Sequence, residues 1–123
     1  MKPAEKKEHA LIRFILQKIS EDVQDKATVK SNDGLGFISL ATIEHIIDKR
    51  DRSEGLLSIG NLILLERDVH EDLEDFKLKK EMYDKSKISL TKNFFLDYPY
   101  FGIEDIETRR RNILESFYNL IYK

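Results

Sequence analysis

The stretch that decides the fold is Thr42-Ile43-Glu44-His45-Ile46, which is followed by Ile59-Gly60-Asn61-Leu62 and then by His70. Both runs carry apolar residues typical of short strands, and His70 stands in a segment with apolar residues at helical spacing. In chain order the polar residues are a carboxylate beside an imidazole, then an amide, then a second imidazole. This order indicates a catalytic or metal-binding site carried by two strands and a helix.

These residue types fit one chemistry well. Hydrolysis of a phosphodiester needs a base for the attacking water and a cation that stabilises charge on the phosphate and the leaving oxygen. A neutral imidazole suits the first task, because its ordinary pKa of about 6.5 leaves it mostly unprotonated near neutral pH. A carboxylate and a second imidazole can hold one divalent ion. An Asn amide or its backbone can hydrogen-bond the imidazole of the base and fix its tautomer.

Strand, loop, strand and helix are expected around these residues. The β-forming residues of 37–43 predict a strand that delivers Glu44 and His45 at its end. A polar loop is expected over 48–58, and the apolar run of 61–66 predicts a buried strand that can pair with the first. Adjacent strand positions point to opposite faces, so Glu44 and His45 could flank a phosphate from different sides.

A helix is expected over 68–85, with Asp68 as its N-cap and His70 in its first turn. The inward stripe of this helix would contain Val69, Leu73, Phe76 and Tyr83. Further helices are expected over 9–24, over 89–95 and from 103 to about 122. The sequence therefore predicts an α+β domain that is mostly helical.

Composition narrows the class of protein. With 123 residues the chain fits one domain, and the absence of cysteine excludes disulfides, zinc ribbons and thiol nucleophiles. The net charge of -2, with 36% charged residues, means that any nucleic-acid surface must be a local patch. We expect a cytoplasmic protein without a membrane partner, because the N-terminus lacks a signal-peptide core and no apolar run approaches the roughly 20 residues of a membrane helix.

Five basic residues are weak candidates for nucleic-acid binding. Lys49, Arg50 and Arg52 lie in the loop after His45, where they could follow a phosphate backbone. Lys77 and Lys80 lie beyond His70 and could extend that positive track. Solubility alone would also produce such charges, and no residue set suggests readout of base sequence.

The stretch from Thr42 to Arg109 resembles the HNH-like domain at the C-terminus of GmrSD-type, modification-dependent restriction endonucleases and related phage-defence proteins. That family's pattern begins with an apolar residue-Glu-His-Ile, continues with Gly-Asn-Leu before an apolar strand, and then has an Asn or His on a helix. Phe-x-x-Lys-Lys-x-x-Tyr-x-x-Ser and an Ile-x-x-Arg helix follow. The matching residues here are Ile43-Glu44-His45-Ile46, Gly60-Asn61-Leu62, His70, Phe76, Lys79, Lys80, Tyr83, Ser86, Ile106 and Arg109.

The resemblance implies a role for each residue of the set. His45 would be the general base, and Asn61 would orient it. Glu44 and His70 would be the ligands of one divalent ion, Mg²⁺ in the first place, with Mn²⁺ or Ni²⁺ as alternatives. Apart from the resemblance, we expect Arg109 to be structural and to hold the last helix against the core.

The implied fold is a single α+β domain over 1–123 around a ββα-metal (HNH or His-Me finger) nuclease core. That core would occupy 37–86, with an N-terminal helix and loop at 1–36 and C-terminal helices at 87–123. The implied activity is DNA nicking or cleavage in a bacterial or phage-related restriction or antiviral defence system. The implied partner is an N-terminal nucleotide-hydrolysing sensor domain or subunit.

Two positions depart from the family pattern. Ile47-Asp48 stands where the family usually has Leu-Pro, which leaves the entry to the loop open. His70 stands where the family more often has Asn, which leaves the metal preference open. Two other functions also fit the sequence: a non-catalytic DNA- or partner-binding module that retains the ββα scaffold, and an RNA-cleaving nuclease.

Overall fold

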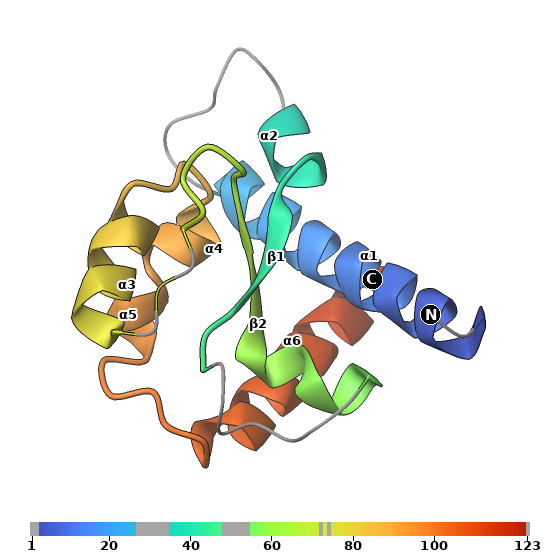
Figure 1. Cartoon of the computed structure of the whole chain (residues 1–123). Coiled ribbons are helices and arrows are strands. Elements are labelled where there is room, and N and C mark those ends of the chain that lie inside the picture. Colours follow the sequence, from blue (N-terminus) through green and yellow to red (C-terminus); the bar gives the residue numbers. More distant parts are fainter. Residues whose placement is uncertain (1–2, 27–34, 48–54, 72, 74, 123) are drawn as a thin grey trace.

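An antiparallel hairpin runs through the middle of the protein (Figure 1). The computed structural model describes residues 3–26, 35–47, 55–71, 73 and 75–122. Strand β1 (Thr42–His45) pairs with β2 (Leu62–Leu65), with Thr42 opposite Leu65 and His45 opposite Leu62. All four side chains of β2 are buried, as the sequence predicted for this run.

Helices make up most of the rest of the described chain, so the expected mostly helical domain with a two-stranded hairpin is confirmed. The long N-terminal and C-terminal helices lie where the apolar spacing predicted them. The elements are α1 (Pro3–Lys26), α2 (Gly36–Ser39), the 3-10 helix η1 (Gly55–Asn61), α3 (Phe76–Asp84), α4 (Ser89–Lys92), α5 (Phe94–Asp97) and α6 (Asp105–Ile121).

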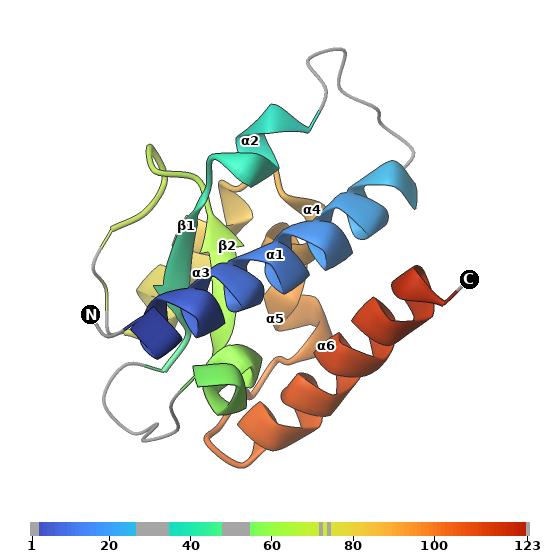
Figure 2. The same ribbon diagram turned by 90° about the vertical axis from the view of Figure 1, so that its right-hand side faces the viewer.

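The hairpin lies between two groups of helices. Figures 1 and 2 show α1 across one face of the hairpin and α3 on the other. Because neighbouring strand residues point to opposite faces, β2 contributes to two cores. The α1-side cluster consists of Ile12, Ile15, Leu16, Ile19, Ile38, Ala41, Ile59, Leu62, Leu64, Ile88 and Ile113. The α3-side cluster consists of Ile46, Ile47, Ile63, Leu65, Met82, Tyr83, Phe94, Phe101 and Ile106.

The strand predicted over 37–43 is wrong over its first part. Residues Gly36–Ser39 form α2, which buries Ile38 completely, and β1 begins only at Thr42. Arg13 of α1 donates to the carbonyl of Ser39 at 2.8 Å and thereby ties α2 to α1. The four-residue strand β2 offers no partner before Thr42, and without a partner strand β propensity alone does not make a strand.

The helix predicted over 68–85 begins later than expected. Asp75, and not Asp68, is its N-cap, since the Asp75 carboxylate accepts from the backbone N–H of Lys77 at 2.8 Å. His70 therefore does not lie in the first turn of a helix. It lies in a turn after β2, where its N–H donates to the carbonyl of Glu66 at 3.0 Å. The short Asp side chain favours a cap over a helix interior, because it can bond nearby backbone N–H groups.

Part of the predicted loop over 48–58 lies outside the described residues. Its end belongs to η1, which begins at Gly55. The approach of η1 to α6 is very close, because a Cβ at Gly60 would lie 1.9 Å from the carbonyl oxygen of Ile106. Only glycine fits between these two backbones.

Arg109 joins α6 to the hairpin, as predicted. Its guanidinium donates to the carbonyls of Gly60 at 2.9 Å and Leu62 at 2.7 Å, and lies 5.2 Å from the ring centroid of Phe94. Burial lowers the pKa of Arg109 to about 10, so the side chain keeps its charge at neutral pH. In the described part of the chain, no helix has the length and apolar character that crossing a membrane requires.

Candidate functional site

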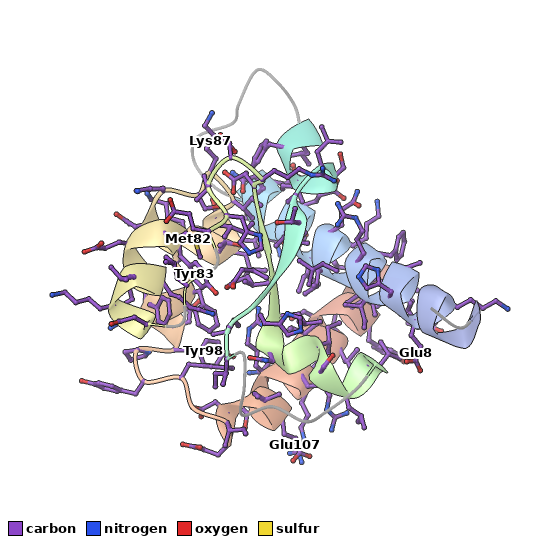
Figure 3. All side chains as sticks on the ribbon, viewed as in Figure 1. Glu8, Met82, Tyr83, Lys87, Tyr98 and Glu107 are labelled. Carbon is purple, nitrogen blue, oxygen red and sulfur yellow. The ribbon has the colours of Figure 1, made fainter. Side chains whose placement is uncertain are left out.

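Glu44 is a buried carboxylate on β1. It pairs with Ile63 across the hairpin, so its side chain points to the α3 side, where it is 4% exposed. The Tyr83 hydroxyl of α3 donates to one carboxylate oxygen, and Lys79 Nζ lies 3.4 Å from the other. Figure 3 shows Tyr83 on the side of α3 that faces the hairpin. Two side chains of one helix therefore hold this carboxylate.

The charge state of Glu44 depends on opposing effects. Burial raises the pKa of the carboxyl above its ordinary value, because desolvation disfavours the ionised form. The Tyr83 hydroxyl, the Lys79 ammonium and His70 act in the opposite direction and do not cancel it. A further cation beside Glu44 would favour the ionised carboxylate.

His70 lies beside Glu44, as the sequence predicted, although it does not lie on a helix. Its Nδ1 is 2.7 Å from Thr42 Oγ1, and that hydroxyl donates its proton to the carbonyl of Leu65 at 2.8 Å. Since a hydroxyl has a single proton, Nδ1 must be the donor to Thr42. In the neutral ring Nε2 then carries a lone pair, and it lies 4.0 Å from Glu44 Oε1.

The His45 side chain belongs to a different environment. It follows Glu44 on β1 and is exposed, whereas Glu44 is buried. Among the hydrogen bonds of the described residues, none joins its imidazole to Glu44, Asn61 or His70. Its main chain does join the network, because Lys79 Nζ donates to the His45 carbonyl at 2.6 Å.

Asn61 is fully buried and acts on the backbone that follows His45. Its Oδ1 accepts from the N–H of Ile47 at 2.8 Å, and its Nδ2 donates to the carbonyl of Ile47 at 2.7 Å. Its own carbonyl accepts from Ile46 at 2.9 Å. The amide thus fixes the end of β1 through the main chain.

Two of the five basic residues predicted to bind nucleic acid belong to the described part of the chain. Lys49, Arg50 and Arg52 lie outside the described residues. Lys77 and Lys80 are exposed on α3, and Lys80 Nζ lies 5.5 Å from the ring centroid of Phe95. They can reach a ligand outside the molecule.

Sequence reasoning missed three residues that contact the predicted ligands. Thr42 contacts His70, and Lys79 and Tyr83 contact Glu44. The spacing of Lys79 and Tyr83 gave a signal, since residues four apart lie on one helix face. A buried lysine on that face calls for a nearby acceptor. In the described ranges, no group of three or more His, Cys, Asp or Glu side chains that could hold a metal occurs.

Comparison with known protein families identifies the family of this chain. The family described as the C-terminal domain of GmrSD restriction endonucleases matches residues 2–116. The chain belongs to this family. Membership in the GmrSD family implies a nuclease role in restriction, and the resemblance inferred from the sequence is confirmed. No curated protein and no solved structure matches the chain.

Proposed function

We propose that this GmrSD-family domain is a divalent-metal-dependent HNH endonuclease that nicks or cleaves DNA phosphodiesters. Strands β1 and β2 and helix α3 would form its ββα-metal core, within one domain over 1–123. The N-terminal helix and loop (1–36) and the C-terminal helices (87–123) would support the core at 37–86. The pairing of Glu44 with His70 carries this proposal.

Glu44 and His70 would hold the ion. Their facing atoms are 4.0 Å apart, and an ion bonded to both at about 2.1 Å spans up to about 4.2 Å. Tyr83 binds the other oxygen of Glu44, and Thr42 binds the other nitrogen of His70. Oε1 of Glu44 and Nε2 of His70 are therefore the two atoms that would bind the ion. Mg²⁺ is the first candidate, and Mn²⁺ or Ni²⁺ suit a mixed oxygen and nitrogen set as well.

The bound ion would supply a positive charge for the phosphate and the leaving oxygen. His45 would remove the proton from the attacking water, and its exposure supports access of both water and DNA. Asn61 would position His45 through the backbone of residues 46 and 47. In this proposal the amide acts on the base indirectly.

Contacts with the DNA backbone would come from basic side chains. The candidates are Lys77 and Lys80 on α3, together with Lys49, Arg50 and Arg52, which follow His45 in the sequence. Such contacts strengthen binding without reading sequence, and salt weakens them. Recognition of modification or infection would then fall to the partner, an N-terminal nucleotide-hydrolysing sensor domain or subunit, in a cytoplasmic defence system.

The test is cleavage of supercoiled plasmid in Mg²⁺, Mn²⁺ or Ni²⁺ by the wild-type chain and by His45→Ala. The expected loss in the variant is about 10²–10⁴-fold in rate, the usual contribution of a general base. His9→Ala is the matched control, because His9 is exposed on α1 and should leave the rate unchanged.

Equal nicking by the wild type and His45→Ala would remove His45 from the mechanism. If the wild type cleaves a single-stranded RNA but not plasmid, and His45→Ala shows the same loss of rate, the substrate is RNA and not DNA. If plasmid binds and neither substrate is cut with any of the three ions, the domain is a DNA-binding module.

A further inference from the structure

We propose that Lys79 is a positioning residue for the reaction: its buried ammonium fixes the main chain of residues 45 and 46 and thereby the imidazole of His45. This inference rests on the proposed function, because it assigns Lys79 a role through the proposed base. The family pattern contains this lysine, but the pattern itself gives no reason for it.

Lys79 Nζ has three oxygen partners among the described residues. It donates to the carbonyls of His45 at 2.6 Å and Ile46 at 2.9 Å, and it lies 3.4 Å from Glu44 Oε1. The two carbonyls are thus the closer partners, and the carboxylate is the more distant one. Lys79 is 1% exposed, and burial of an ammonium is costly unless each of its protons finds an acceptor.

The lysine completes a set of bonds around the end of β1. Asn61 binds the N–H groups of Ile46 and Ile47 and the carbonyl of Ile47 from one side. Lys79 binds the two preceding carbonyls from α3. The backbone from His45 to Ile47 is therefore held from two elements. Since the His45 side chain is exposed, this backbone is the main constraint on where its ring lies.

The neighbouring lysine provides a contrast. Lys80 follows Lys79 on α3 but is exposed and lies against the Phe95 ring. Among the three lysines of α3, all of them described, Lys79 is the one whose ammonium bonds to β1. A general positive charge on α3 would not require this burial, which supports a specific role for Lys79.

The test uses Lys79→Met, which keeps the length of the side chain and removes the donor. We expect kcat for plasmid nicking to fall by about 10–100-fold, the usual loss for an outer partner of a catalytic group, with KM changed less than about threefold. Leu16→Ala is the control for lost stability, because Leu16 lies in the α1-side cluster. At a temperature where it is folded, its kcat should equal that of the wild type.

A double variant separates positioning from a general effect. If Lys79 acts through His45, then adding Lys79→Met to His45→Ala should slow the reaction by less than about threefold, since residues that act as a unit are non-additive. A full further loss of 10–100-fold in the double variant would overturn the proposal, and so would an unchanged kcat in Lys79→Met.

A spectroscopic measurement keeps this inference distinct from the proposed function. The chain has 3 histidines, so the ring signals of His45 can be assigned by their loss in His45→Ala. Lys79→Met should shift or broaden the His45 signals and leave those of His9 in place, while Leu16→Ala should shift neither. Unchanged His45 signals in Lys79→Met would refute positioning even if the chain cleaves DNA. Failure of the proposed function would instead appear as equal nicking by His45→Ala.

Discussion

Two buried carboxylates lie at the hairpin, and their partners differ. Glu44 on β1 is held by side chains only, namely Tyr83 and Lys79, with His70 beside it. Glu66, directly after β2, accepts from the Ser86 hydroxyl at 2.5 Å and from the backbone N–H of Lys87 at 2.8 Å. The two residues offer the same chemical group in different surroundings.

The difference separates a structural carboxylate from a candidate ligand. Both oxygens of each carboxylate have a partner, but at Glu66 one of the bonds comes from the main chain that leads into α4. This fixes the link between α3 and α4. At Glu44 the nearest nitrogen of His70 is still 4.0 Å away, a spacing that a cation can bridge. Replacement by the amide should therefore lower activity at Glu44 and stability at Glu66.

The largest expected effect is loss of activity in Glu44→Gln. An amide cannot act as an anionic ligand, so nicking should fall more than about 10²-fold at fixed Mn²⁺, beyond the 10–100-fold that loss of an outer partner causes. Plasmid assays and calorimetric titration with Mn²⁺ would measure the rate and the affinity. Glu66→Gln is the matched control and should keep both when folded. Equal Mn²⁺ affinity in wild type and Glu44→Gln would show that Glu44 is no ligand.

A smaller effect is expected on stability in Glu66→Gln. The amide keeps one acceptor but presents a donor where the Ser86 hydroxyl or the Lys87 N–H now donates. The cost of a mismatched buried hydrogen bond is about 1–3 kcal/mol in the free energy of unfolding. Urea denaturation measures it. A variant as stable as the wild type would mean that the link after α3 does not depend on Glu66.

The smallest effect concerns the pH dependence of stability. Burial raises the pKa of Glu44 in the folded state above its value in the unfolded chain, so the folded state binds more protons between the two values. The contribution of Glu44 to stability is therefore fully present at low pH and declines as the pH rises through the raised pKa. Glu44→Gln does not titrate and lacks this decline.

Urea denaturation of Glu44→Gln and of the wild type from about pH 4 to 7 should thus show the variant gaining in relative stability as the pH rises. Parallel curves would contradict the raised pKa, and a relative loss with rising pH would mean that the ion pair with Lys79 dominates.

The sequence predicted the parts of the fold that depend on local pattern. The helices at both ends, the buried strand β2 and the anchoring role of Arg109 are confirmed. The predicted bounds were wrong where contacts beyond the local pattern determine where an element begins. Residues 37–39 became helix because no partner strand faces them, and the helix over 68–85 starts at Phe76 because Asp75 caps it.

In the candidate site, too, the sequence predicted some contacts and could not predict those that depend on how distant parts of the chain meet. The order of Glu44 and His70 predicted that they would meet, and they do. The sequence could not reveal that Asn61 binds Ile47 and not the His45 ring, because that bond depends on how the hairpin closes. Lys79 and Tyr83 stood in the family pattern, but their partner on β1 lies 35 and 39 residues away along the chain.

The Asn61 side chain imitates a peptide group. It offers Ile47 one acceptor and one donor, as a residue of a neighbouring strand would. The hydrogen bonding of the hairpin is thereby extended to Ile47 without a further residue in β2. Deamidation to aspartate, a change of a single heavy atom, would turn that donor into an acceptor and set two oxygens against each other. Deamidation of Asn61 would thus weaken its bonds to Ile47 and release the end of β1 that carries His45.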